Sequence, residues 1–219
     1  MSLHNFINNM MDRGLKIDTV FDIGACSGDW SLEFKHTLPN SQFFLFEANY
    51  KWAPSLERTN FPYFSGTVLS KPGKEFVEFY DEQSTGASYY KENTGWFENK
   101  VATKYPCKTL DEIILQCNLP IPNLVKLDTQ GSELDILAGA KSIIGKTDLI
   151  YIECPIVNYN QGAPNIYEYI NFFLVNDYIP IDCYELHKLE NVLIQLDILF
   201  MRRETKEKFL GSHPNIKVL

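Results

Sequence analysis

The fold of this chain is decided by two stretches, VFDIGACSG at residues 20–28 and VKLDTQGSELDILAGA at residues 125–140. Each consists of an apolar run typical of a buried strand, then an acidic residue, a glycine turn and the start of a helix. In an open α/β sheet, ligands bind just beyond the carboxyl ends of the strands. Both stretches therefore place carboxylates and accessible backbone at that edge, which favours an enzyme with a nucleotide-like cofactor over a passive domain.

Strands and helices alternate along most of the chain, which predicts an α/β fold with a mostly parallel sheet and helices on both faces. We expect core strands at residues 19–25, 42–48, 63–69, 124–127, 149–154, 178–184 and 193–202. We expect helices at residues 3–14, 29–36, 50–58, 109–117, 132–144 and 166–176. No helix separates the last two strands, so they predict an antiparallel hairpin at one edge. The pattern indicates one domain over residues 1–219, with an N-terminal helix in 1–17 and an inserted hairpin or lid in 71–108.

The composition disfavours several classes of partner. The chain has 219 residues, of which 45% are hydrophobic, enough for one large core. Its net charge of −8 offers no basic footprint for nucleic acid and makes an anionic membrane surface a poor partner. No stretch reaches the roughly 18 apolar residues of a membrane-spanning helix, and the start does not resemble a signal peptide. Five widely spaced cysteines without a CxxC pair predict reduced thiols in a cytoplasmic protein.

The first stretch has the features of a cofactor-binding loop. Gly24 permits a sharp turn and the close approach of a ligand, and a helix that begins at Gly28 and Asp29 offers free N–H groups to a carboxylate. Glu47 ends the next strand about twenty residues later, the position of an acid that accepts ribose hydroxyls. The spacing is GxxxG rather than the GxGxxG of dinucleotide-binding folds, which disfavours a nicotinamide cofactor.

Asp22, Gly24, Gly28 and Glu47 together resemble the S-adenosylmethionine site of class I methyltransferases. The full set expected to form the cofactor site is Asp22, Gly24, Ala25, Gly28, Asp29, Glu47, Ala48 and Ser70.

The second stretch resembles the hallmark of the FkbM family of methyltransferases, a K-x-D-x-(E/Q)-G-x-E run followed by a helix of L-x-x-L-x-G-A type. Further pieces agree in order, namely DIGACSGDWS (22–31), FEAN (46–49), VLSKPGKEFVEFY (68–80), CKTLDEII (107–114) and LIYIEC (149–154). The resemblance spans roughly residues 18–200 and departs from the family's commoner residues at Cys26, Ala48 and Gln130. It implies a Rossmann-like sheet of seven strands in the order 3-2-1-4-5-7-6, with the last strand reversed. It also implies methyl transfer from S-adenosylmethionine to oxygen, commonly a hydroxyl of a sugar, glycan or secondary metabolite.

Three carboxylates are candidates for catalysis. Asp128, at the end of the fourth strand, is the first candidate for a general base, which would speed attack by a hydroxyl roughly 10²–10⁴-fold. Glu133, in the first turn of the next helix, and Glu153, at the end of the fifth strand, are the others, and each also has a purely structural interpretation. Because neighbouring carboxylates repel one another, we expect at least one raised pKa. No metal is indicated, although Asp128 and Glu153 offer the oxygen ligands that a divalent cation prefers. His187, in the loop before the last strand, is a candidate to face the site, but we expect it to be an exposed loop residue.

The acceptor site is less well determined by the sequence. Aromatic and small hydroxyl side chains suit sugar rings, so we expect contacts from Ser84, Thr85, Ser88, Trp96 and Tyr159. The same aromatic residues would also suit an insert that merely covers the core. A nucleic-acid or cap methyltransferase is an alternative that the acidic charge disfavours. A catalytically inactive S-adenosylmethionine-binding protein is another, disfavoured by the intact acids at the strand ends. The sequence specifies neither the acceptor nor the oligomeric state.

Overall fold

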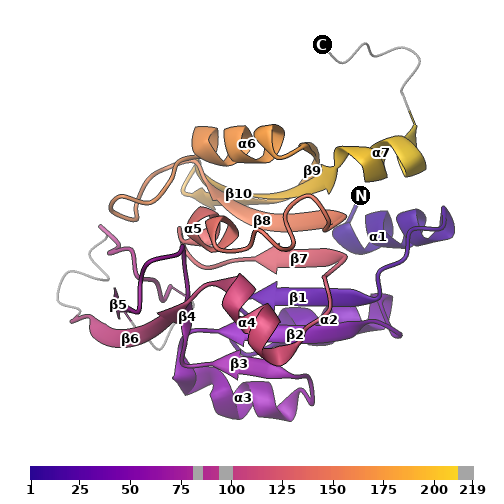
Figure 1. Ribbon diagram of the computed structural model, residues 1–219. Coiled ribbons are helices and arrows are strands. Elements are labelled where there is room, and N and C mark those ends of the chain that lie inside the picture. Colours follow the sequence, from indigo (N-terminus) through magenta and orange to yellow (C-terminus); the bar gives the residue numbers. More distant parts are fainter. Residues whose placement is uncertain (81–85, 94–100, 212–219) are drawn as a thin grey trace.

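The computed structural model describes residues 1–80, 86–93 and 101–211 (Figure 1). Seven strands form the main sheet in the order β3-β2-β1-β7-β8-β10-β9. Their bounds are β1 Thr19–Ile23, β2 Gln42–Glu47, β3 Tyr63–Ser65, β7 Leu124–Leu127, β8 Leu149–Pro155, β9 Tyr178–Leu189 and β10 Val192–Arg202. The neighbouring pairs β3–β2, β2–β1, β1–β7 and β7–β8 are parallel, whereas β10 runs antiparallel to both β8 and β9. Numbered among themselves, these strands give the order 3-2-1-4-5-7-6, so the expected fold and the reversed last strand are confirmed.

Helices cover both faces of the main sheet (Figure 1). The helices are α1 Leu3–Asp12, α2 Asp29–Thr37, the 3₁₀ turn η1 Tyr50–Trp52, α3 Ala53–Arg58, α4 Leu110–Cys117, α5 Glu133–Ala138, α6 Ile166–Val175 and α7 Arg203–Leu210. One buried cluster joins α4, α5 and α6 to alternate strand residues such as Phe21 and Val125. The other joins α1, α2 and α3 to the intervening residues, such as Val20 and Leu124. The central strands are therefore buried on both sides, as expected for a parallel sheet.

A smaller sheet lies beside the carboxyl ends of β1 and β7, at the left in Figure 1. It contains β4 Val68–Leu69, β6 Thr103–Lys108 and β5 Phe76–Phe79 in the order β4-β6-β5. Strand β6 pairs antiparallel with β5, within the segment 71–108 where an inserted hairpin or lid is expected. This sheet has its own small apolar cluster around Phe79 and Tyr105, so it forms a wall next to the end of the main sheet at which ligands bind.

Several boundaries differ from the sequence expectation. The expected strand at 63–69 divides into β3 and β4 at Gly66, whose φ of +76° turns the chain. The helix expected at 132–144 ends at Ala138. The next residue, Gly139, packs so closely that a Cβ there would lie 2.5 Å from the Ser70 carbonyl oxygen. Strand β9 continues to Leu189, and α7 was not expected from the sequence. The capping box expected at the start of α4 is present, formed by Thr109 and Glu112.

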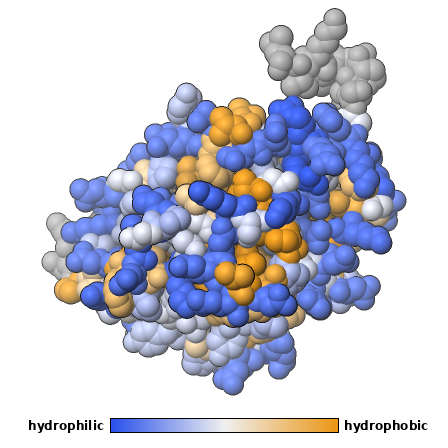
Figure 2. All heavy atoms as spheres, viewed as in Figure 1, coloured by the Kyte–Doolittle hydropathy of each residue, from blue (hydrophilic) through white to orange (hydrophobic). Residues whose placement is uncertain are grey.

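The face of the molecule in Figure 2 is mostly hydrophilic, with small hydrophobic groups between the polar side chains. Among the described residues, no helix has the length and apolar character needed to cross a membrane. All five cysteines lie within the described part of the chain and are free thiols.

Candidate active site

A cavity of about 570 Å³ lies at the carboxyl ends of the central strands. Its wall combines the loop after β1, the end of β2, strand β4, the loop after β7, the end of β8 and the β9–β10 hairpin. Of the residues expected at the cofactor site, Gly24, Ala25, Asp29, Glu47 and Ala48 line it, and of the expected catalytic residues, Asp128 and Glu153 line it. The two stretches that decide the fold therefore meet in one cavity.

The turn after β1 approaches the turn after β7 so closely that only glycine fits. Gly24 has a φ of +77°, and a Cβ on it would lie 1.8 Å from the backbone oxygen of Asp128. The N–H groups of Gly24 and Ala25 donate to the Phe46 carbonyl at 2.8 and 3.0 Å, which fixes the turn against β2. The glycine thus has a structural cause that is independent of any ligand: two backbone turns occupy the space of a side chain.

Glu47 is almost fully buried at the end of β2, at 8% exposure. Its Oε2 accepts from the Cys26 N–H at 2.8 Å and its Oε1 from the Asn49 N–H at 2.7 Å. Burial raises the pKa of Glu47, while the two backbone donors oppose that rise. Because each carboxylate oxygen can accept more than one hydrogen bond, Glu47 is oriented by the protein and still has acceptor capacity toward the cavity.

Lys126 is a buried cation that connects the two loops beneath the cavity. Its Nζ lies 3.4 Å from Asp22 Oδ1 and 3.3 Å from Asp128 Oδ2, and it donates to the Gly24 carbonyl at 3.0 Å. Burial opposes its charge, but Asp128 and Asp22 together raise the pKa of Lys126. Asp22 and Lys126 are register partners on β1 and β7, which is why the two charges meet below the loops.

Three of the expected cofactor residues lie outside the cavity wall. Asp22 is fully buried, where its Oδ2 accepts from Ser31 Oγ at 2.7 Å and its Oδ1 faces Lys126. Gly28 has a φ of +86° and packs against Thr59, and Ser70 is buried with its hydroxyl against Tyr89. These three residues therefore lie in or behind the loops that surround the cavity.

Asp128 and Glu153 face the cavity from adjacent strand ends, and Gln130 connects them. The Gln130 Nε2 lies 2.9 Å from Glu153 Oε2 and 3.3 Å from Asp128 Oδ1. Burial, followed by the charges of Asp128 and Glu133, raises the pKa of Glu153 well above its ordinary value. The expected pKa rise in this acidic group is therefore present at Glu153, whereas the Asp128 side chain is 42% exposed and next to Lys126.

Glu133, the third expected catalytic residue, is not at the cavity wall. It is fully buried, and its Oε1 accepts from the Thr129 N–H at 2.7 Å and the Gly131 N–H at 3.2 Å. Its Oε2 accepts from the Tyr169 hydroxyl, and burial raises the pKa of Glu133. The Glu133 carboxyl group therefore braces the loop that carries Asp128 and links it to Tyr169 on α6.

Two further polar residues reach this region from the hairpin. His187 lines the cavity, and its Nε2 lies 3.2 Å from Asp197 Oδ1. The expectation that His187 is an exposed loop residue is therefore wrong: β9 extends past it and turns the side chain toward β10. Asp197 was missed, although the pattern LIQLDILF carries a signal, since Gln195 and Asp197 alternate with apolar residues and so share a strand face.

The expected acceptor residues are dispersed. Ser88 is buried and its Oγ donates to the Gln130 carbonyl at 2.9 Å, so it supports the loop after β7. Tyr159 lines a separate small pocket of about 10 Å³ that also contacts Glu153. Ser84, Thr85 and Trp96 lie outside the described residues.

The fold of this chain is similar to that of solved methyltransferases. The plantazolicin methyltransferase BamL, solved with a triazolic desmethylPZN analog and S-adenosylhomocysteine, has a TM-score of 0.53 at 9% identity, covering 92% of this chain and 83% of that one. The precorrin-6y C5,15-methyltransferase of Geobacter metallireducens has a TM-score of 0.49 at 14% identity, covering 89% and 84%. At these identities the likeness concerns the fold alone.

The sequence itself matches the Methyltransferase FkbM domain over residues 22–180. The chain therefore belongs to the FkbM family of methyltransferases, and the resemblance of its motifs is confirmed. A search of curated proteins found no match.

Proposed function

We propose that this enzyme transfers a methyl group from S-adenosylmethionine to a hydroxyl of a sugar, glycan or secondary metabolite. The observation that carries the proposal is that one cavity holds Glu47 at the end of β2 and Asp128 at the end of β7. Its volume of about 570 Å³ is within the range of roughly 300–1,000 Å³ that suits small-molecule sites. Residues 1–219 would act as one catalytic domain.

S-adenosylmethionine is the methyl donor, and the loop after β1 together with Glu47 forms its site. The oriented Glu47 carboxylate accepts the ribose hydroxyls, as acids at this position do in nucleotide-binding folds. The start of α2, a helix of nine residues, offers N–H groups to the carboxylate of the donor's amino-acid part. The turn at Gly24 leaves the backbone bare beside this part of the cavity.

Asp128 is the general base of the proposed reaction. A sulfonium donor is already activated, so most of the catalysis comes from alignment of acceptor oxygen, methyl carbon and sulfur, worth roughly 7–11 kcal/mol. The Asp128 carboxylate stands at the cavity wall, held by Lys126 and Gln130, where it can accept the proton of the hydroxyl. Glu153, with its raised pKa, is the second candidate for this role.

A small acceptor fits the charge and dimensions of the protein. The net charge of −8 opposes binding to a phosphate backbone, and BamL carries a natural-product analogue in the same fold. Since the five thiols are free, we place the reaction in the reducing cytoplasm.

The donor site is tested by calorimetry with S-adenosylhomocysteine. We expect binding of one molecule per chain and a large loss of affinity in Glu47→Ala, while the exposed Glu33→Ala on α2 binds as the wild type does. Failure of the wild type to bind this ligand, or equal affinity in Glu47→Ala, would refute the proposed donor site.

The base is tested by methyl transfer from radiolabelled S-adenosylmethionine to a panel of sugars, glycans and polyphenols. We expect Asp128→Asn to retain donor affinity and to lose roughly 10²–10⁴-fold in turnover. The matched control is Asp12→Asn, at an exposed position at the end of α1. Turnover by Asp128→Asn near that of the control would remove Asp128 as the base.

A further inference from the structure

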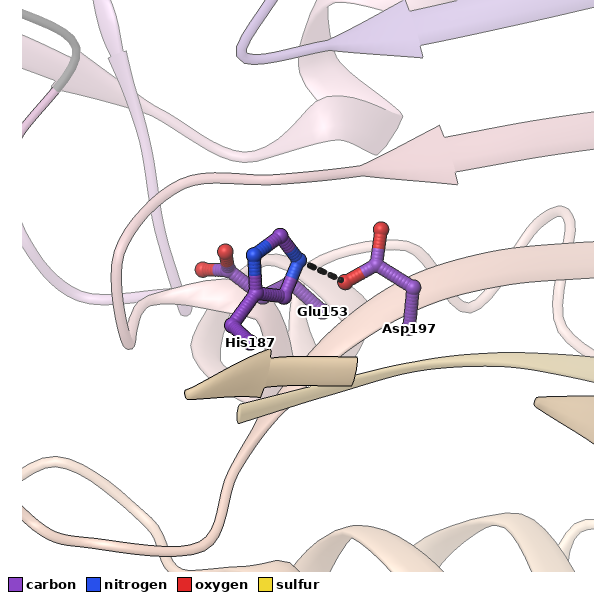
Figure 3. Close-up of side chains that lie close together, drawn as sticks. All are labelled: Glu153, His187 and Asp197. Carbon is purple, nitrogen blue, oxygen red and sulfur yellow. Dashed lines mark hydrogen bonds and ion pairs between the residues drawn. The ribbon is translucent and has the colours of Figure 1, made fainter. Parts of the chain in front are cut away.

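Glu153, His187 and Asp197 form a cluster of side chains of metal-ligating type beside the cavity, whose wall includes Glu153 and His187. One ligand atom from each lies within 4.8 Å of the other two. Figure 3 shows the His187 ring between the two carboxylate groups, with one ring nitrogen directed at Asp197. The three side chains are partly buried, with 39% exposure for His187 and 16% for Asp197, so the cluster is protected and still reachable from the cavity.

The fold, not the sequence spacing, brings these residues together. Strand β10 lies between β8 and β9. Asp197 on β10 is the register partner of Glu153 on β8, and Gln195, two residues earlier, is the register partner of His187 on β9. Three adjacent strands thus each supply one ligand to the same face. Sites on rigid strands hold their ligands more accurately than sites on loops.

A residue outside the cluster orients one oxygen of each carboxylate. The Tyr151 hydroxyl donates to Asp197 Oδ2 at 2.9 Å, and the Gln130 Nε2 donates to Glu153 Oε2 at 2.9 Å. The second oxygen of Asp197, Oδ1, lies 3.2 Å from His187 Nε2. Hydrogen bonds of this kind to the outer oxygen are the usual support for carboxylates that ligate a metal.

The electrostatics of the cluster favour a cation. The carboxylates of Asp128 and Glu185 add further negative charge beside those of Glu153 and Asp197. Lys126, the buried cation nearest to Glu153, is already paired with Asp22 and Asp128. A divalent ion would offset the mutual repulsion of these carboxylates.

We propose that Glu153, His187 and Asp197 bind one divalent transition-metal ion and that this ion holds the acceptor hydroxyl. The combination of one imidazole with two carboxylates suits ions such as Mn²⁺, Fe²⁺ or Zn²⁺ rather than Ca²⁺. The proposal rests on the proposed function for its catalytic part, because the ion stands where the acceptor would meet Asp128.

The ion would act as a Lewis acid on the acceptor. Coordination lowers the pKa of a bound hydroxyl, and its proton passes to the Asp128 carboxylate. The resulting oxygen forms the new bond to the methyl carbon while the carbon–sulfur bond breaks. Its electron pair stays on sulfur, which leaves neutral S-adenosylhomocysteine, so no further reactant is required.

The test measures Mn²⁺ binding directly by electron paramagnetic resonance on protein stripped of metal, without any acceptor. We expect one Mn²⁺ per wild-type chain. His187→Ala and Asp197→Asn should each lower the affinity for Mn²⁺ more than about 100-fold. Substitution of a residue that only supports a ligand typically lowers metal affinity roughly 10–100-fold. Tyr151→Phe, which removes only the support of Asp197, should fall within that range. His36→Ala, at an exposed position of α2, is the matched control and should bind as the wild type does.

Two outcomes would overturn the metal site. The first is no saturable Mn²⁺ binding, with methyl transfer that continues in a chelator. The second is binding that survives His187→Ala and disappears in Asp128→Asn, which would move the ion to Asp128 and Glu153. S-adenosylhomocysteine affinity, measured on the same variants, verifies that they are folded. It also separates the two proposals, since a protein that binds this ligand but no metal refutes only the metal site.

Discussion

The buried cation at Lys126 offers a sharp test of how the two loops are held together. In Lys126→Met, the Nζ that lies 3.4 Å from Asp22 and 3.3 Å from Asp128 disappears, while the apolar stem is retained. The Asp22 side chain is fully buried, and its Oδ1 makes no hydrogen bond to any described residue, so Lys126 is the cation that balances it. Removal of one partner from a buried ion pair costs about 3–5 kcal/mol.

The contribution of Asp128 to this figure is small, because its side chain is 42% exposed and water can replace the lysine. The lost hydrogen bond to the Gly24 carbonyl adds about 1–3 kcal/mol if that oxygen is left unsatisfied. We therefore expect Lys126→Met to lower the free energy of unfolding by at least about 3 kcal/mol. This is a large share of the roughly 5–15 kcal/mol of a typical domain.

The assay is urea unfolding followed by far-ultraviolet circular dichroism. The matched control is Lys71→Met, which breaks an ion pair with Asp135 at 3.1 Å whose lysine is 48% exposed and which should cost less than about 1 kcal/mol. The double variant Lys126→Met, Asp22→Asn should be more stable than Lys126→Met alone, since it no longer buries an unbalanced charge. Equal losses in Lys126→Met and Lys71→Met would refute the reasoning.

Three further predictions concern the glycine turn, the donor site and the loop brace. Gly24→Ala should destabilise the protein by more than Gly73→Ala: both residues have positive φ, at +77° and +89°, but only Gly24 would clash, so the difference in urea midpoint isolates the close approach. Glu47→Gln should weaken S-adenosylhomocysteine binding less than Glu47→Ala in calorimetry, because the amide keeps one acceptor oxygen; the reverse order would contradict its role with ribose. Glu133 has a pKa raised by burial, so the folded state binds its proton more tightly than the unfolded state does. Its contribution to stability is present below the ordinary glutamate pKa and is lost as pH rises toward the raised value. The stability of the wild type relative to Glu133→Gln should therefore fall over that pH window, as measured by thermal unfolding. A stability difference between the two proteins that does not change with pH would contradict this prediction.

Much of the fold was predictable because it depends on local patterns. Strands β1, β7 and β8 are short apolar runs with acidic residues at their ends. The capping box formed by Thr109 and Glu112 predicts the start of α4. The predicted boundaries that differ from the structure lie where contacts between residues distant in sequence are made. At the end of α5, for example, Gly139 packs against the Ser70 carbonyl oxygen.

At the site, too, part of the arrangement was predictable from the sequence and part depended on the tertiary structure. The acids that follow strands, Glu47, Asp128 and Glu153, were predictable, because the carboxyl ends of parallel strands meet at one edge of the sheet. Asp22 and Glu133 belong to the same motifs, but burial turns them into a charge partner and a loop brace. A motif specifies which residue types occur together and not which of them remain in contact with the cavity.

The sequence by itself determined the class of fold, the family and the two turns that meet at the cavity. These follow from the period of apolar residues and from the glycines and acids at fixed offsets, which act within a few residues. Only the tertiary structure brought His187 and Asp197 to Glu153, since that meeting depends on the placement of β10 between β8 and β9 and on a β9 that extends past its expected end. Strand order and register place such residues together through hydrogen bonds between distant segments, which no short sequence pattern records.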